Sequence, residues 1–194
     1  MLQQLDTWDK QALIFLNGLH ADMLDPVIFY VTKTEFWIPL YLYLIYLIFR
    51  DHRRQGWLVM AGVVVSILLT DRITSGLMKP FFERLRPSHD PTIEGLLHLV
   101  NGYRGGLYGF ASSHAANTMG IALFIFLLFR KSYRYIWLMF VWAGVMCYTR
   151  IYLGVHYPGD ILAGTTVGLA CGYAAYRFYR WLQGKFPMKG NPTS

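Results

Sequence analysis

Charged side chains are scarce in this sequence of 194 residues, since Asp, Glu, Lys and Arg together make up only 15% of it. Soluble globular domains usually carry about 25%. The hydrophobic fraction is 55%, and the few charges gather in short groups between apolar runs. This composition argues against a soluble domain, and we predict that residues 1–194 form a single membrane domain.

Cysteine is nearly absent too. Cys147 and Cys171 both lie within apolar segments, which argues against a disulfide framework. The first twenty residues lack the clean apolar core of a cleavable signal peptide because they include Asp6, Asp9 and Lys10. His, Cys, Asp and Glu do not cluster at metal-ligand spacing. We therefore predict that the protein uses neither a metal nor a cofactor.

Long apolar segments dominate what is present. Together they predict an all-α fold, a polytopic transmembrane bundle of five to six helices. Residues 1–20 have apolar side chains at helical spacing and predict an amphipathic helix that lies in the membrane interface. Asp25-Pro26 predicts the start of a short helix, and the polar tail 184–194 is predicted to be flexible. The five strongest apolar segments are 36–49, 57–78, 115–129, 135–152 and 158–181.

The net charge of +7 does not indicate nucleic-acid binding, because the basic residues form no continuous stripe. Ten of the 18 Lys and Arg residues fall instead at one set of helix ends, which the positive-inside rule assigns to the cytoplasm together with the C-terminus. The loop 88–110 is then extracytoplasmic. The ten residues are Arg50, Arg53, Arg54, Arg130, Lys131, Arg134, Arg177, Arg180, Lys185 and Lys189.

Polar residues gather at the opposite helix ends in three stretches, 79–87, 110–114 and 149–160. Alternating spans bring all three to one side of the membrane. Their cations, small hydroxyls and helix N-terminus suit a tetrahedral phosphate, because guanidinium forks and backbone N–H groups neutralise its oxygens. The sequence therefore predicts a phosphate site on the outer face.

Two histidines in these stretches have the spacing and the partners that hydrolysis requires. His156 and Asp160 are four residues apart, so the carboxylate can orient the imidazole as a nucleophile. His114, at the start of another helix, can protonate the leaving oxygen. A pair of metal ligands at His156 and Asp160 is the alternative, but a cation as near as Arg150 argues against it.

These stretches resemble the signature of the type 2 phosphatidic acid phosphatase (PAP2) superfamily, Lys-x6-Arg-Pro, Pro-Ser-Gly-His and Ser-Arg-x5-His-x3-Asp. The sequence departs from it at Ala111, Ser113 and Thr149, where the family has Pro, Gly and Ser. Of the three, Ser113 matters most, because glycine allows a close backbone approach to phosphate. The matching residues are Lys79, Arg86, Pro87, Ser112, His114, Arg150, His156 and Asp160.

The resemblance implies a helical-bundle fold and a phosphohistidine intermediate on His156. It also implies that Lys79, Arg86, Ser112 and Arg150 bind the phosphoryl group. The N–H and the hydroxyl of Ser113 remain able to add hydrogen bonds to the phosphate, and Arg84 is predicted to be an auxiliary residue.

The predicted function is hydrolysis of a lipid phosphate or pyrophosphate at the periplasmic face of a bacterial inner membrane. Family analogy favours undecaprenyl pyrophosphate as the substrate, with lipid A, phosphatidylglycerol phosphate and phosphatidic acid as alternatives. The only partners expected are the lipid substrate and the membrane. A non-catalytic lipid-phosphate binder or transporter is the alternative outside enzymes, and the presence of His156 and Asp160 argues against it.

Overall fold

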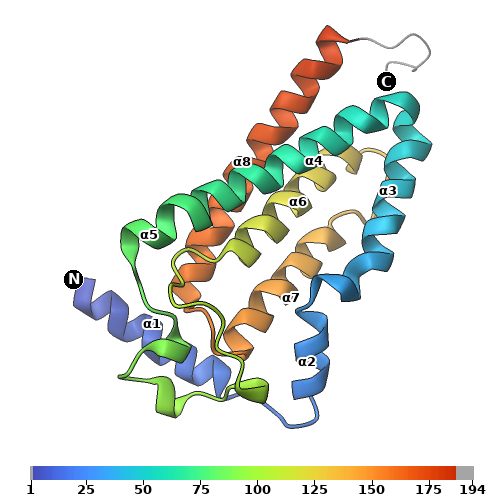
Figure 1. Ribbon diagram of the computed structural model, residues 1–194. Helices are drawn as coiled ribbons and strands as arrows, with labels where there is room; N and C mark the ends of the chain where they lie inside the picture. The colour runs from blue at the N-terminus through green and yellow to red at the C-terminus, as the bar shows by residue number, and fades with distance from the viewer. Residues whose placement is uncertain (1, 187–194) are drawn as a thin grey trace.

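The computed structural model describes residues 2–186, and helices account for most of them. No strand occurs within that range, which confirms the predicted all-α class. Figure 1 shows the longer helices side by side as a bundle, with α1 lying across its lower end. The α-helices are α1 (Leu2–Asn17), α2 (Asp25–Val31), α3 (Ile38–His52), α4 (Gly56–Asp71), α5 (Lys79–Phe82), α6 (Ser113–Phe129), α7 (Leu138–Tyr152) and α8 (Pro158–Lys185).

The helical run Thr34–Phe82 is long and apolar enough to cross a membrane. The chain turns within it at Arg53, whose φ of 47° ends α3, so that α3 and α4 form two separate arms (Figure 1). Helices α6 and α7 are apolar but have only 17 and 15 residues. At ~1.5 Å per residue they are about 23–26 Å long, somewhat less than the ~30 Å of a hydrocarbon core.

A seam of small residues joins α8 to α6. A Cβ on Gly168 would lie 2.3 Å from the carbonyl oxygen of Ala116, and one on Gly172 would lie 2.4 Å from that of Gly120. Only glycine permits backbones to approach this closely, and helices in membranes commonly pack through such small residues spaced four apart. The seam brings the N-terminal ends of α6 and α8, which carry His114 and Asp160, against each other.

Two predicted boundaries were wrong. The second apolar segment does not end at residue 78, because it continues through the π-helix Arg72–Met78 into α5. Lys79 therefore lies within a helix, and π-helical turns occur often at functional sites. Helix α8 extends to Lys185, so the tail predicted to be flexible from residue 184 begins as helix. The remainder of that tail, residues 187–194, lies outside the described residues.

Helix α1 forms as predicted, and one face of it packs on the rest of the protein. Leu13 and Asn17 are buried. The side-chain amide of Asn17 donates to the carbonyl oxygen of Tyr152 at 2.7 Å and accepts from the backbone N–H of His98 at 2.8 Å. Helix α1 is thus tied both to the end of α7 and to the loop that follows α5.

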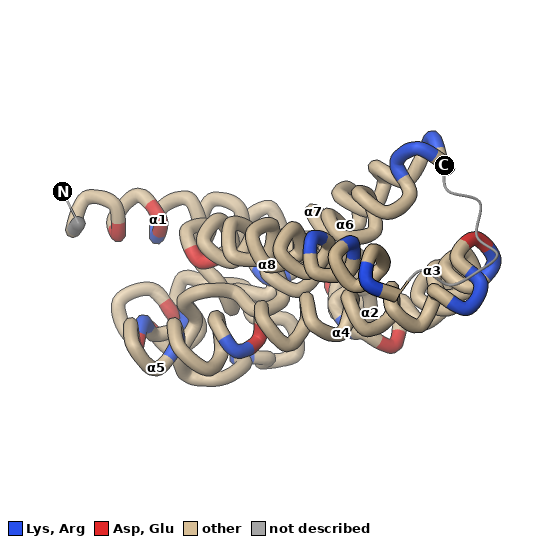
Figure 2. Tube along the Cα trace, turned by 90° about the horizontal axis from the view of Figure 1, so that it is seen from above, with Lys and Arg blue, Asp and Glu red and all other residues tan. Residues whose placement is uncertain are grey.

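The loop 88–110 contains short 3₁₀ turns and is also packed, since Ser88 and Val100 are buried. Figure 2 shows Lys and Arg at the far ends of α3 and α8, whereas acidic and basic residues are mixed at the end formed by α1 and α5. The basic ends are those that the sequence assigns to the cytoplasm. The loop 88–110 lies with α1 at the opposite end of the bundle (Figure 1).

Candidate active site

The structure brings the three polar stretches together beside α1. The carbonyl oxygen of Asp160 accepts from the backbone N–H of Ser112 at 3.0 Å, which joins the third stretch to the second. The guanidinium of Arg86 lies 3.0 Å from the imidazole of His156, which joins the first stretch to the third. Residues that are as much as 81 positions apart in sequence thus share one site.

His156 is buried between an acid and a base. Its Nδ1 lies 3.3 Å from Oδ2 of Asp160, and its Nε2 lies 3.0 Å from Nη1 of Arg86. This arrangement assigns the proton to Nδ1, which donates to the carboxylate, and leaves the lone pair on Nε2. Burial, and after it the nearby cations, hold the pKa of His156 well below its usual range. The imidazole is therefore neutral at pH 7, as a nucleophile must be.

Arg86 enters this site from the loop after α5. Its Nε donates to the carbonyl oxygen of Tyr108 at 3.2 Å and its Nη1 to that of Val155 at 3.4 Å. The side chain is nearly buried. Within residues 2–186 it has no carboxylate partner, so its charge remains available to an anion.

Arg150, on α7, is also buried, and among residues 2–186 it likewise forms no salt bridge with a carboxylate. Its Nη1 donates to the hydroxyl of Thr32 at 3.0 Å and its Nη2 to that of Tyr103 at 3.4 Å. Its Nε has no hydrogen-bond partner in the part of the chain that the structure describes. Burial of a guanidinium is costly unless an anion compensates it. Arg86 and Arg150 together therefore favour a dianionic ligand such as a phosphate.

Lys79 and Ser113 complete the cationic side of the site. The ammonium of Lys79 donates to the hydroxyl of Ser113 at 2.8 Å and to that of Ser75 at 3.2 Å. Thr74 also donates to the Ser113 hydroxyl, at 2.9 Å. The serine that stands where the family has glycine thus holds Lys79 in place. The π-helix supplies the neighbouring hydroxyls of Thr74 and Ser75.

Ser112 has a structural role at the start of α6. It is the N-cap of α6, where its hydroxyl accepts from the N–H of Ala115 at 3.4 Å. Its own backbone N–H donates to the carbonyl oxygen of Asp160. The donors left at the start of α6 are the N–H groups of Ser113 and His114, because the first turn of a helix has no intrahelical acceptors for them. The structure thus shows Ser112 supporting the site, while its contact with phosphate stays a prediction.

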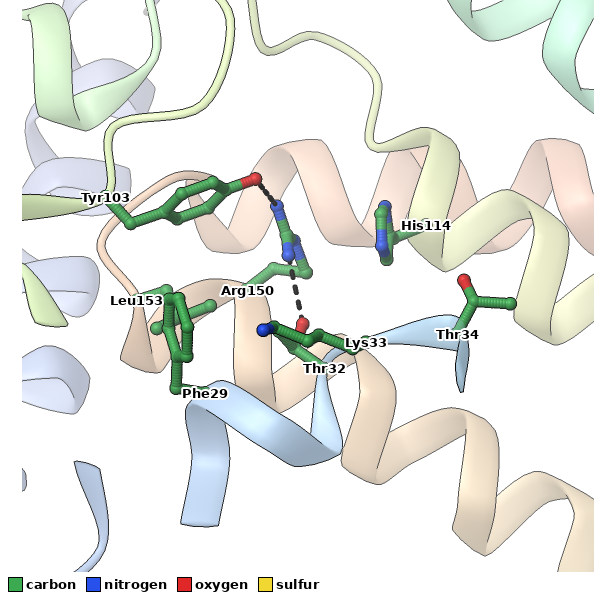
Figure 3. Close-up of a pocket in the computed structure, with 8 residues that line it drawn as sticks. All are labelled: Phe29, Thr32, Lys33, Thr34, Tyr103, His114, Arg150 and Leu153. Atoms are coloured by element: carbon green, nitrogen blue, oxygen red, sulfur yellow. Dashed lines mark hydrogen bonds between the residues drawn. The ribbon is translucent and has the colours of Figure 1, made fainter. Parts of the chain in front are cut away.

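His114 lines a pocket of about 210 Å³ next to Arg150 (Figure 3). In the figure, Arg150 stands between the ring of His114 and the hydroxyl of Tyr103. Lys79 and Arg86 line a second pocket, of about 400 Å³. The first pocket is bounded by Phe29, Thr32, Lys33, Thr34, Tyr103, His114, Arg150 and Leu153.

Arg84, which the sequence predicts to be an auxiliary residue, lines neither pocket. Its guanidinium binds the carboxylates of Asp160, Asp9 and Asp6. The sequence did not indicate that Asp6 and Asp9 of α1 belong to the site. It also did not indicate Thr32 and Tyr103, the partners of Arg150. The presence of Asp6 and Asp9 in helix α1 could have indicated that it binds a cation, but no local sequence pattern identifies Arg84 as that cation.

Among residues 2–186, His, Cys, Asp and Glu form no group of three or more that could hold a metal ion. The polar side chains that line the two pockets are cations, hydroxyls, the imidazole of His114 and the carboxylate of Glu83, and the buried imidazole of His156 lies behind Arg86. Together these groups can bind an oxyanion, supply a nitrogen nucleophile and move a proton.

Comparisons with known proteins agree with this chemistry. The sequence profile of the PAP2 superfamily matches residues 59–183. A protein of Bacteroides thetaiotaomicron named lipid A 4'-phosphatase is 39% identical over 181 residues, which cover 92% of this chain and 79% of the relative. A protein of the same name from Porphyromonas gingivalis is 34% identical over 185 residues, which cover 92% of this chain and 78% of the relative.

Two solved structures share the fold. The crystal structure of Aquifex aeolicus LpxE matches with a TM-score of 0.67 at 22% identity, over 86% of this chain and 93% of that one. A transmembrane PAP2-type phosphatidylglycerolphosphate phosphatase from Bacillus subtilis matches with a TM-score of 0.61 at 23% identity, over 93% of this chain and 87% of that one. At such identities the likeness concerns the fold alone.

Proposed function

This chain belongs to the PAP2 superfamily of membrane lipid phosphatases, and we propose that its substrate is a lipid A-type molecule from which it removes the 4'-phosphate. The observation that carries the proposal is the identity of 39% and 34% with two relatives of that name, over 92% of this chain. These relatives favour lipid A, an alternative at the sequence level, over the expected undecaprenyl pyrophosphate. They also favour an enzyme over a lipid-phosphate binder.

The pocket beside His114 supports a sugar as the leaving group. An acid that protonates the leaving oxygen must lie next to the group that departs. The rings of Phe29 and Tyr103 line this pocket and can pack against a sugar, and Lys33 and Thr34 line it with polar groups for the sugar hydroxyls or a second anionic group.

The proposed reaction needs only side chains of this site. Arg86, Arg150 and Lys79 bind the phosphoryl oxygens and neutralise them. The Nε2 lone pair of His156 attacks phosphorus while the bond to the lipid oxygen breaks. His114, protonated once the anionic phosphate offsets the cations around it, gives that oxygen its proton. Asp160 stabilises the positive charge that develops on the imidazole. Water then cleaves the phosphorus–nitrogen bond, with His114 accepting the proton of the attacking water, and phosphate leaves.

Release of phosphate from four purified lipids tests the substrate. We expect lipid A bearing a 4'-phosphate to be turned over faster than undecaprenyl pyrophosphate, phosphatidylglycerol phosphate and phosphatidic acid.

Lys33→Met should raise KM for lipid A and leave hydrolysis of a small soluble ester unchanged. Lys131→Met, an exposed lysine in the turn after α6, is the control. Preference for another lipid would refute the substrate, and binding without turnover would favour a binder.

Activity is expected to persist in EDTA and to be blocked by vanadate. The reason is that three cationic side chains take the place of a metal ion, while vanadate mimics the five-coordinate phosphorus of the transition state. Phosphate release with and without each reagent measures both effects. Loss of activity in the chelator that a divalent ion restores would contradict the metal-free mechanism.

We further propose that the helices form a bundle of five to six spans, with α1 in the interface and the site on the periplasmic side of the inner membrane. The basic ends of α3 and α8 support this orientation through the positive-inside rule (Figure 2).

A cysteine at Gly95, an exposed position with open space around its Cα, is expected to react with a membrane-impermeant thiol reagent in intact cells. Gly95 is chosen within the loop 88–110 because it is exposed, whereas a position such as Ser88 is buried and would not react. Lys131→Cys, at the other end of the bundle, should react only after lysis. The native Cys147 and Cys171 are both buried. The reverse labelling pattern would refute the orientation.

A further inference from the structure

Asp9 of α1 reaches two elements of the active site at once. Its Oδ1 accepts from the backbone N–H of Gly159 at 2.7 Å, in the first turn of α8. Its Oδ2 accepts from Nη2 of Arg84 at 2.8 Å. A carboxylate is favoured at a helix N-terminus, so α1 is bound directly to the helix that carries Asp160.

Arg84 lies between this carboxylate and Asp160. Its Nη1 donates to Oδ1 of Asp160 at 2.9 Å, and its Nη2 also reaches Asp6 at 3.2 Å. Its guanidinium lies over the ring of Tyr157, 4.0 Å from the centroid. Contacts with three carboxylates and a ring face hold the guanidinium in one orientation.

Both oxygens of the Asp160 carboxylate are thereby assigned. Oδ1 receives Arg84, while Oδ2 receives the backbone N–H of Tyr157 at 3.1 Å and faces Nδ1 of His156 at 3.3 Å. The carboxylate is completely buried. Arg84 is its only Lys or Arg salt-bridge partner within residues 2–186, and an unpaired buried carboxylate would tend to protonate or rotate.

We propose that Asp9 and Arg84 form a positioning relay, in which Asp9 holds Arg84 and Arg84 holds Asp160 so that Oδ2 meets His156. The inference rests on the proposed role of Asp160 in orienting the nucleophile. It makes α1 a part of the catalytic architecture as well as a helix at the membrane surface. Neither Asp9 nor Arg84 lines either of the two pockets, so we infer that both act through Asp160.

Helix α1 has other anchors, which allow docking to be separated from the relay. Lys10 binds Asp90 at 2.9 Å, in the loop after Arg84. Lys10 also pairs with Asp6 at 3.2 Å. Lys10→Met therefore loosens α1 and releases Asp6, while the contact between Asp9 and Arg84 remains. Gly159→Ala disturbs the contact between Asp9 and Arg84 and leaves the pair of Lys10 and Asp90 in place. A Cβ at residue 159 would lie 2.7 Å from Oδ2 of Asp9 and would displace the carboxylate without removing its charge.

The experiment measures kcat and KM of the purified full-length protein in detergent, on a soluble ester such as p-nitrophenyl phosphate and on the best lipid. Arg84→Gln should lower kcat by about 10–100-fold, the usual cost of removing a group that orients a site residue. KM should hardly change, because no phosphate contact is lost. Asp9→Asn should lower kcat less. Arg84→Lys keeps the charge but loses the two-nitrogen fork, so it should restore only part of kcat.

Coupling between the two residues gives a sharper test. The double variant of Asp9→Asn and Arg84→Gln should be no slower than Arg84→Gln alone, because both changes break the same chain of contacts. Gly159→Ala should reproduce Asp9→Asn. Lys10→Met should stay near the wild-type rate, as should Asp22→Asn, which removes an exposed carboxylate of the turn after α1.

The relay would be overturned by equal losses in Lys10→Met and Asp9→Asn, by additive losses in the double variant, or by a change in KM alone. Asp160→Asn separates this inference from the proposed mechanism: an unchanged kcat in that variant refutes the role of Asp160 itself. If Asp160→Asn is slow while Arg84→Gln is not, only the relay fails. Thermal unfolding identifies any variant that fails to fold. If Arg84→Gln does not fold, the kcat values of Arg84→Lys and Asp9→Asn decide whether the relay exists.

Discussion

Replacing His156 by alanine is expected to abolish hydrolysis of every phosphate ester, whatever its leaving group. The substitution removes the nitrogen that bonds phosphorus, so no phosphoenzyme can form. Loss of a covalent nucleophile lowers kcat by roughly 10⁴-fold or more. Acid-labile phosphohistidine, trapped from radiolabelled substrate, should be present in the wild type and absent from the variant.

Controls for His156→Ala are available within the chain. His20→Ala removes a histidine whose ring stacks on that of His98, near the end of α1, and should leave turnover unchanged. Asp160→Asn should resemble a partial His156 defect, because it disturbs the orientation of the imidazole and leaves the nucleophile in place. Phosphohistidine that still formed in His156→Ala would assign the nucleophile to another residue.

Replacing His114 by alanine is expected to slow the lipid reaction strongly while sparing activated esters. His114 supplies only the proton of the leaving oxygen, and general acid catalysis typically contributes ~10²–10⁴-fold. A lipid or sugar alkoxide needs that proton, whereas p-nitrophenolate leaves almost unaided. Turnover of lipid A should therefore fall by about this factor, and that of p-nitrophenyl phosphate, if the wild type accepts it, should remain measurable.

A pyrophosphate lipid provides an intermediate case for His114→Ala, because its leaving group is itself a phosphate. The ratio of variant to wild-type rates should rise from lipid A through the pyrophosphate to the nitrophenyl ester. Equal losses on all three, together with no trapped phosphohistidine, would mean that His114 is not the acid. The roles of His114 and His156 would then have to be exchanged or abandoned.

The helices and the phosphate chemistry could be predicted from the sequence for local reasons. A backbone inside a bilayer must satisfy its own hydrogen bonds, so an apolar segment of this length has few structures other than a helix. The residue types that bind and cleave a phosphate ester are few, and Lys79, Arg86, His114, Arg150 and His156 stand at the spacings of a known signature. Alternation of spans then placed the three stretches on one side.

Only the tertiary structure decided how the supporting residues are used. The π-helix put Lys79 within a helix and beside Ser113, and the N-cap of α6 took up the hydroxyl of Ser112. Periodicity indicates which face of a helix is apolar, but it does not identify the partner of a charge.

The contacts of Arg84 give the physical reason. Arg84 meets Asp9 across 75 residues of sequence and Asp160 across 76. These pairings exist because the glycines of α8 let it approach α6 closely and because α1 lies across the same end of the bundle (Figure 1). The sequence by itself determined the helices and which groups we propose to react, whereas packing between distant segments decided which side chains hold those groups in position.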